Sequence, residues 1–277
     1  LGIDASAFMC RVANEKKIKT INCIFNKKVS SDIVKKYGKF DIIIANNVLN
    51  HANDPFDFVD GVNTILSKKG KFIFELPYWY NLISMKKFDQ IYHEHVSYMT
   101  VKSSFNLLKK NKLEIFKIKQ TSYHGGSIRV FSNPSKNVNL NNHVKKLIDK
   151  EEKLKLFETD TYLNFMKDLK KKKFIFLRKV LSYKLRGYII IGIGAAAKAN
   201  TFLNYIGLDN SIITYITDSS KYKIGKYTPL TRIPIYSDNI IKTAGNKICA
   251  IPLAWNIGYM LQKKLLKVNK NIKFINF

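Results

Sequence analysis

The stretch FDIIIANNVLNHANDPFDFVDGVNTILSKKGKFIFELPY, residues 40–78, decides the fold class of this chain. The apolar run over residues 40–50 predicts a strand buried on both faces, as in a parallel sheet. Asp54 and Pro55 predict the start of a helix, with the aspartate as N-cap and the proline at the first helical position. A second apolar run, residues 68–78, predicts the next strand. This order of strand, helix and strand indicates a parallel sheet with helices on its faces.

The same rhythm extends toward the N-terminus. Residues 1–4 end a strand in an acid, and Ser6 is expected to cap the helix that follows. Residues 18–25 read as a strand and residues 29–37 as a helix. The chain opens on Leu1 in the middle of this pattern, so we expect it to be a fragment that lacks the start of its first domain.

The pattern changes after residue 80. A helix over residues 103–111 precedes two strands, 114–120 and 127–133, which we expect to pair antiparallel at the end of the parallel sheet. Residues 136–185 are long, polar and helical, and we expect a linker made of two helices. The first domain is therefore expected to cover residues 1–135.

A second α/β domain is expected over residues 186–277. Residues 187–207 read GYIIIGIGAAAKANTFLNYIG, which predicts a strand, a glycine turn and a helix. A further strand ends at Asp218, and residues 246–255 predict a later strand. The two α/β parts both resemble mononucleotide-binding units.

Composition narrows the class of protein. The 277 residues are 46% hydrophobic, enough for two domains with cores, and they contain neither an apolar run of membrane-spanning length nor a signal peptide. Three scattered cysteines indicate neither a disulfide framework nor a metal site, and they favour a cytoplasmic protein. The net charge of +28 has two interpretations. It indicates a nucleic-acid or membrane partner, or it reflects a drift of the overall composition toward lysine that has no function. Only residues 170–173 form a tight basic run, so drift is favoured, and we expect no nucleic-acid or membrane partner.

Polar residues at strand ends are the first candidate site, because ligands of open α/β sheets bind at the carboxyl ends of the strands. Asp4 ends the first strand and is a candidate for ribose hydroxyls, with a simple capping role as the alternative. Asn46, Asn47 and His51 follow the strand over residues 40–50.

The densest chemistry is the motif YHEH, Tyr92 to His95. Histidine titrates near neutral pH, and a nearby carboxylate can orient it, so the motif favours acid–base catalysis. A metal site is disfavoured because no third ligand lies at zinc spacing. A polar surface turn is the alternative. We favour a functional role for His51, His93, His95 and His124, which all fall at strand ends or in loops.

Two glycine-rich turns are candidates for substrate binding. Gly125 and Gly126 precede a strand and permit close approach of a ligand, although an ordinary hairpin turn is the alternative. In the turn GIGAAAK, residues 192–198, the small residues and the following helix start suit a phosphate or diphosphate. The candidate substrate-binding residues of this second α/β domain are Gly194, Lys198, Asn200, Asp218, Lys226 and Tyr227.

Together, FDQIYHEHVSYMT (88–100), HGGS (124–127) and GIGAAAK (192–198) resemble the motifs of the sugar C-methyltransferase family, in the family's order. The resemblance implies a class I methyltransferase sheet, here incomplete at the N-terminus, followed by a helical linker and a second Rossmann-like domain. It implies S-adenosylmethionine as cofactor, bound near Asp4, Asn46 and Asn47, and a nucleotide-linked keto-deoxysugar as substrate. The residues that match the family's catalytic set are His95 as general base, with Tyr92, Glu94 and His51 in support.

Two parts of the family pattern are missing, a cysteine-rich zinc module and a glycine-rich cofactor loop. The resemblance therefore implies zinc only in the missing module. A non-catalytic nucleotide-sugar-binding remnant is the alternative function. The sequence indicates no oligomeric state.

Overall fold

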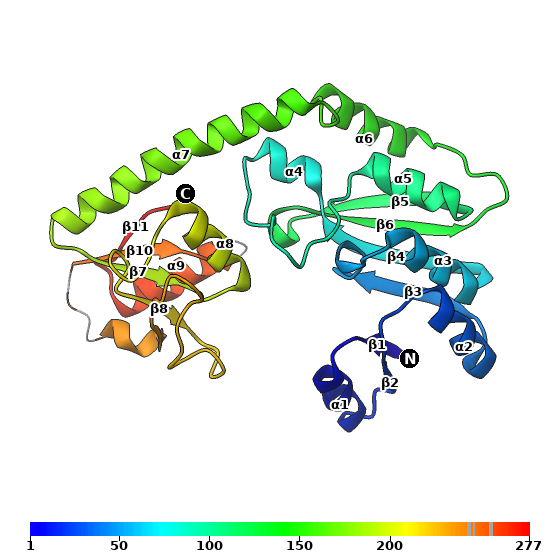
Figure 1. Ribbon diagram of the computed structural model, residues 1–277, viewed down its shortest axis with the longest axis horizontal. Helices are drawn as coiled ribbons and strands as arrows, with labels where there is room; N and C mark the ends of the chain where they lie inside the picture. The colour runs from blue at the N-terminus through cyan, green and yellow to red at the C-terminus, as the bar shows by residue number, and fades with distance from the viewer. Residues whose placement is uncertain (243–244, 246, 255–256) are drawn as a thin grey trace. The chain divides into compact units, whose positions relative to one another are not determined.

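The computed structural model describes residues 1–277 except 243–244, 246 and 255–256, together with the side chain of His124 (Figure 1). The chain forms two compact units. Unit 1 comprises Leu1–Asn81 and Glu94–Phe157, and unit 2 comprises Leu82–His93 and Glu158–Phe277. These limits differ from the expected boundaries at residues 135 and 185, because the two expected linker helices pack on different units.

The main sheet of unit 1 has four strands in the order β3-β4-β6-β5. Strands β3 and β4 are parallel, whereas β6 pairs antiparallel with both β4 and β5. The antiparallel pair predicted after the parallel strands is therefore confirmed. The strands are β3 (Phe40–Asn46), β4 (Leu66–Pro77), β5 (Leu113–Thr121) and β6 (Ser127–Pro134).

The N-terminal segment forms a separate two-stranded parallel sheet. Its elements are β1 (Gly2–Asp4), α1 (Ala7–Glu15) and β2 (Thr20–Asn22), and α2 (Lys27–Tyr37) follows. The side chain of Ser6 accepts a hydrogen bond from the backbone nitrogen of Met9, as expected for an N-cap. Gly38 ends α2 at φ 74°, in the left-handed region that favours glycine.

Helix α3 (Pro55–Ile65) begins as the sequence predicts. The Asp54 side chain accepts from the backbone nitrogens of Phe56 and Asp57, which satisfies donors that the first turn leaves without helical partners. Phe58, Val59, Val62 and Ile65 recur at helical spacing and are all buried. The helix therefore turns its apolar face to the core of unit 1.

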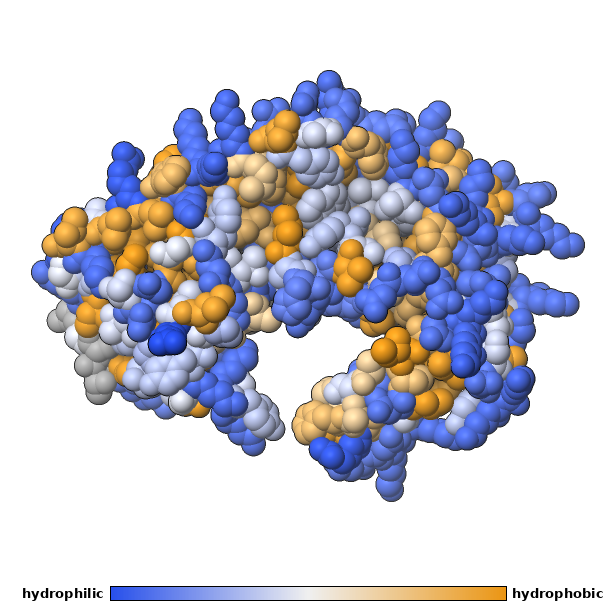
Figure 2. Space-filling model, viewed as in Figure 1, coloured by the Kyte–Doolittle hydropathy of each residue, from blue (hydrophilic) through white to orange (hydrophobic). Residues whose placement is uncertain are grey.

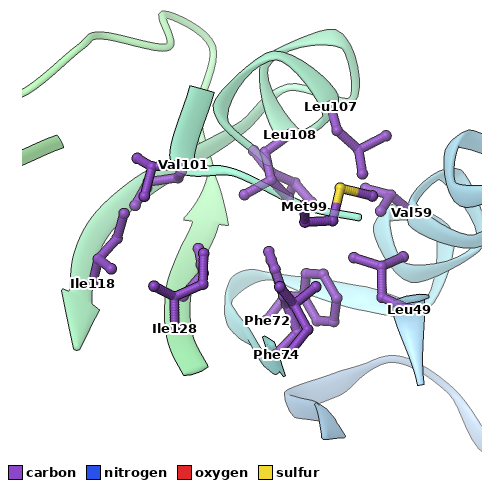
Figure 3. Packing of buried hydrophobic residues seen from close by; sticks show 14 of the residues in the cluster. Leu49, Val59, Phe72, Phe74, Met99, Val101, Leu107, Leu108, Ile118 and Ile128 are labelled. Atoms are coloured by element: carbon purple, nitrogen blue, oxygen red, sulfur yellow. The ribbon is translucent and has the colours of Figure 1, made fainter. Parts of the chain in front are cut away.

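The core of unit 1 lies between its main sheet and the helices α3, α5 (Val101–Lys110) and α6 (Asn142–Lys153). Figure 3 shows Met99 and Leu108 above Phe72 and Phe74 of β4, with Leu49 and Val59 beside them. Helix α5 starts at a capping box in which Thr100 and Ser103 satisfy each other's backbone nitrogens. Helix α4 (Trp79–Ser84) follows β4.

Strand β3 differs from the prediction that it is buried on both faces. Ile42 and Ile44 are 61% and 62% exposed, whereas Ala45 is buried. Among the described residues β3 pairs only with β4, so its other edge has no strand partner. Figure 2 shows hydrophobic side chains at the surface of this part of unit 1. The apolar run was read correctly as a strand, but nothing described in unit 1 covers this face.

Unit 2 is built on a parallel sheet in the order β11-β10-β7-β8-β9. Its core includes Ile191, Ile193, Ile248 and Leu265. The strands are β7 (Ile189–Ile193), β8 (Tyr215–Asp218), β9 (Ile235–Ser237), β10 (Ile248–Pro252) and β11 (Lys273–Phe274). The helices are α7 (Thr159–Leu185), α8 (Ala197–Ile206) and α9 (Gly258–Val268). The predicted fold class, α/β with a second Rossmann-like sheet, is confirmed.

In the part of the chain that the structure describes, every helix is too short or too polar to cross a bilayer.

Candidate functional site

A pocket of unit 1 lies at the carboxyl end of β1. Its volume is about 270 Å³. Asp4, Asn47 and His51 line it together with apolar side chains that include Phe25 and Phe58. A carboxylate beside apolar walls suits a nucleoside, whose ribose hydroxyls donate to the acid while the base packs on the walls. Three residues that the sequence singled out separately therefore meet in one pocket.

The two asparagines after β3 have different positions. Asn47 has a φ of 52°, in the left-handed region, and its backbone nitrogen donates to the Glu75 carbonyl of β4 at 2.6 Å. Asn46 is exposed at the end of β3 and does not line this pocket. The Asp4 carboxylate also accepts from the Ser6 backbone nitrogen at 2.7 Å, so its capping and binding roles are compatible.

The short helical turn η1 (Leu49–His51) brings His51 to the YHEH motif. Nδ1 of His51 lies 2.6 Å from the carbonyl oxygen of Glu94. Because a carbonyl only accepts, the hydrogen bond places a proton on Nδ1 and leaves Nε2 as the second functional nitrogen of the ring. This contact uses the backbone of Glu94, and the orientation of a motif histidine by a nearby carboxylate stays a prediction.

His95 lies against His51. The two ring centroids are 5.0 Å apart at an interplanar angle of 69°. His95 is only 9% exposed, and its ring centroid is 6.4 Å from that of Tyr98. The backbone nitrogens of Val96 and Ser97 donate to the Asn50 carbonyl at 2.9 and 3.1 Å. The turn η1 therefore fixes the chain on both sides of His95.

The YHEH motif crosses the limit between the two units. Glu94 and His95 belong to unit 1, whereas Tyr92 and His93 belong to unit 2. Glu94 and His93 are exposed, and Tyr92 is half-buried. The ring of Tyr92 lies edge-on to that of His93, with 6.2 Å between their centroids.

The glycine pair after β5 has a packing role. Gly126 has a φ of 119°, and a Cβ at this position would lie 2.4 Å from Nδ2 of Asn81. Its carbonyl accepts from the Tyr78 backbone nitrogen at 3.0 Å. Gly125 ends the turn η2 (Tyr123–Gly125) at φ 82°. The predicted functional role of His124 falls on a side chain that lies outside the described part of the structure.

The glycine turn of unit 2 is closed by Asp218. Its carboxylate accepts from the backbone nitrogens of Ala195 and Ser220, both at 2.8 Å. Gly194 adopts φ 84°, and a Cβ there would lie 2.7 Å from that of Ala254. Asp218 therefore shapes the turn through the backbone.

A pocket of about 290 Å³ lies beside the start of α8. Asn200, Lys226 and Tyr227, all singled out from the sequence, line it. Lys223 lines it too, with Nζ 2.8 Å from the Ala195 carbonyl and 3.7 Å from the Asp218 carboxylate. Lys223 was missed because a lysine in a basic loop carries no signal of its own.

Lys198 does not line this pocket. The carboxylate of Asp89, from the segment before YHEH, acts on Lys198 electrostatically. Burial lowers the pKa of Lys198, and Asp89 opposes this shift. Burial likewise raises the pKa of Asp89, with Lys198 opposing. Because the two charges compensate each other, Lys198 offers less charge to a phosphate than the sequence indicates. Asp89 was missed because its partner lies more than a hundred residues away.

Comparisons with known proteins identify the class. Residues 2–118, which include the pocket beside Asp4, match the model of a methyltransferase domain. Residues 122–276, more than half of the chain, match the model of the C-methyltransferase C-terminal domain. The chain belongs to the C-methyltransferase family, which confirms the resemblance.

One curated relative is the C-methyltransferase NovU of Streptomyces niveus, 28% identical over 262 residues. The match covers 92% of this chain and 61% of that protein. The chain therefore spans about three fifths of the length of this relative.

Two solved structures of methyltransferases have a limited similarity to part of this chain. A methyltransferase from Clostridium acetobutylicum has a TM-score of 0.37 at 16% identity, covering 48% of this chain and 74% of the other. The magnesium protoporphyrin IX methyltransferase of Synechocystis, with bound S-adenosylhomocysteine, has a TM-score of 0.37 at 16% identity. The match covers 48% of this chain and 63% of the other.

Proposed function

We propose that this chain is the catalytic body of an S-adenosylmethionine-dependent C-methyltransferase that acts on a nucleotide-linked keto-deoxysugar. The observation that carries the proposal is the arrangement of His51 and His95. Their rings lie 5.0 Å apart, and one of them lines the pocket that contains Asp4. The family supplies the reaction type, and the two histidines supply the acid–base groups that such a reaction needs.

The residues of the Asp4 pocket fit the proposed cofactor. The carboxylate of Asp4 suits the ribose, the apolar walls suit the adenine, and Asn47 adds polar groups. When bound, S-adenosylmethionine supplies an electrophilic methyl group. Asn46 and Asn47, both at the end of β3, remain candidates for contacts with it.

The protein's own residues generate the carbon nucleophile. We assign His95 as the base that removes the proton next to the sugar ketone, which leaves an enediolate on the substrate and a proton on the imidazole. Burial of His95 favours this role, because a base enclosed with its substrate competes less with water. The Tyr92 hydroxyl donates a hydrogen bond to the enediolate oxygen, and the Glu94 carbonyl accepts from Nδ1 of His51 and so orients its ring.

The nucleotide part of the substrate is assigned to unit 2. The pocket beside α8 has two lysines, Lys223 and Lys226, next to a helix start that has no side-chain cap. Backbone nitrogens at such a helix start and two ammonium groups favour a diphosphate. The side chains of Tyr227 and Asn200, which also line this pocket, are proposed to contact the base and the sugar of the nucleotide. His93, Gly125 and Gly126 remain candidates for the sugar itself.

The free edge of β3 supports one more part of the proposal, an additional strand that carries a glycine-rich cofactor loop. An apolar groove of about 170 Å³ runs along this edge, with Leu1, Ile3, Ile42 and Ile44 among its lining residues. A strand paired there would cover the exposed isoleucines of β3.

The test is methyl transfer to a thymidine-diphosphate-linked ketodeoxyhexose, with His95→Asn compared against the native protein. A lost general base lowers the rate by about 10²–10⁴-fold. His143→Asn is the matched control, because Nε2 of His143 lies 3.2 Å from the Ile118 carbonyl and His143 has no part in the proposed reaction. Full activity of the His95 variant would contradict the proposal. If the native protein and both variants bind the nucleotide but transfer no methyl group, the result would favour a nucleotide-sugar-binding protein.

A further inference from the structure

Asn50 has an unusual environment for an amide. Its side chain is 2% exposed, and among the described residues neither Oδ1 nor Nδ2 has a hydrogen-bond partner. A buried amide without partners is costly, and buried polar groups in folded proteins are normally paired. Because leucine would fill a similar volume without this cost, a reason other than stability is needed for asparagine here.

The backbone of Asn50 indicates what that reason is. Its carbonyl accepts from Val96 at 2.9 Å and from Ser97 at 3.1 Å, directly after His95. The next residue, His51, holds the Glu94 carbonyl directly before His95. Three hydrogen bonds from two consecutive residues therefore fix the chain around His95.

The position of η1 is itself fixed by the core. Leu49, which precedes Asn50, is 1% exposed and packs beside Val59 in the cluster of Figure 3. Asn50 consequently sits between a rigid anchor and the segment that carries His95. The buried amide thus belongs to the residue whose carbonyl fixes the chain directly after His95.

We propose that Asn50 is a positioning residue for His95, whose buried amide sets the orientation and proton affinity of the imidazole during the reaction. An amide with no fixed partner is free to turn its dipole toward a ring that gains or loses a proton. In a poorly hydrated environment such a dipole acts strongly. The catalytic role of His95 in this proposal rests on the proposed function. The contacts around His95 do not depend on it.

The test is Asn50→Leu, with Asn50→Ala as a second variant in case leucine does not fit. Two readouts are needed: the rate of methyl transfer to the thymidine-diphosphate-linked probe, and the titration of the His95 imidazole followed by NMR without substrate. We expect kcat to fall roughly tenfold to a hundredfold with little change in KM, because small misplacements of a reacting group have effects of this size. The His95 titration shifts in the same variant, and the urea midpoint of Asn50→Leu is unchanged or higher.

Ser104→Ala is the matched control, because the Ser104 hydroxyl is also buried without a partner in unit 1 but lies on α5. It leaves both readouts unchanged. Unchanged kcat and titration in whichever Asn50 variant folds would overturn the proposal. A lower kcat with an unchanged titration would overturn it too, since the amide would then act on the substrate. Because the titration needs no substrate, it tests Asn50 even if the acceptor is not a keto-sugar.

Discussion

At the scale of single residues, Lys223 is the best test of the nucleotide pocket. Its ammonium group is held beside Ala195 and Asp218 at the wall of the pocket. We expect Lys223→Ala to weaken binding of thymidine diphosphate roughly tenfold or more, because a hydrogen bond to a charged group contributes about 1.5–3 kcal/mol. Isothermal titration calorimetry measures the change.

Lys221→Ala is the control for Lys223. Lys221 is exposed in the same loop, carries the same charge and does not line the pocket. Equal losses in the two variants would mean that the general positive field of the protein, and no specific contact, governs binding.

The candidate site could be predicted only in part from the sequence. His51, Asp4 and Asn47 were singled out because polar residues stand out at the ends of apolar strands, and the structure places them in one pocket. Asn50 gave no signal, because an asparagine next to a histidine looks like any loop residue. Its unpaired amide is visible only once the surrounding chain is folded.

At the scale of elements, Glu151 ties α6 to the start of α5. It is fully buried, accepting from the Tyr78 hydroxyl at 2.8 Å and from the backbone nitrogens of Val101 and Lys102. We expect Glu151→Ala to lower the free energy of unfolding by about 3 kcal/mol or more, because three buried donors lose their acceptor. Glu152→Ala breaks only the exposed pair with Lys102 and should cost less than about 1 kcal/mol. Urea unfolding of both variants measures the difference, and similar losses would contradict the assignment.

The same carboxylate predicts a pH effect. Burial raises the pKa of Glu151 above its usual value of 4.5, although its hydrogen bonds oppose the shift. Because the folded protein then holds the proton more tightly than the unfolded chain, the stabilisation from this group is complete below the pKa that Glu151 has in the unfolded chain. It is lost as the pH rises through the pKa that Glu151 has in the folded protein. Relative to Glu151→Gln, the native protein should therefore become less stable as the pH rises above about 4.5. A constant difference between the two unfolding free energies across this range would contradict the prediction.

Most elements were predictable because their signals are local. Asp54 with Pro55 marks the start of α3, and the apolar run before Asp218 marks β8. The failure at β3 has a physical cause. An apolar run indicates a strand but not which neighbours cover it, and Ile42 and Ile44 remain exposed because the second edge of β3 has no described partner.

At the scale of the whole molecule, we expect the free apolar edge of β3 to promote association between chains. Unpaired strand edges with exposed apolar residues promote contact between chains. We expect Ile44→Lys to reduce aggregation of the 277-residue chain, measured by light scattering on heating, with a change in unfolding free energy within about 0.5 kcal/mol because the side chain is 62% exposed. Leu185→Lys is the control, since Leu185 is 88% exposed at the end of α7 and the charge added is the same. Equal protection by both variants would attribute the effect to net charge.

The limits of the two units were the least predictable feature of the molecule. Residues 82–93 lie between a strand and a helix of unit 1 in the sequence, yet they belong to unit 2. Phe88 explains the difference, because its ring packs against those of Phe202 and Tyr205. Such contacts join positions far apart in the sequence and leave no periodic signal.

The central claim, that His95 removes a proton next to a sugar ketone, is tested most directly by hydrogen–deuterium exchange. The protein is incubated in D₂O with the thymidine-diphosphate-linked ketodeoxyhexose, and NMR follows the proton next to the ketone. This readout needs the base and the substrate but no methyl transfer. We predict that the native protein and His143→Asn accelerate the exchange and that His95→Asn does not. Equal acceleration by the His95 variant, or none by the native protein, would contradict the account.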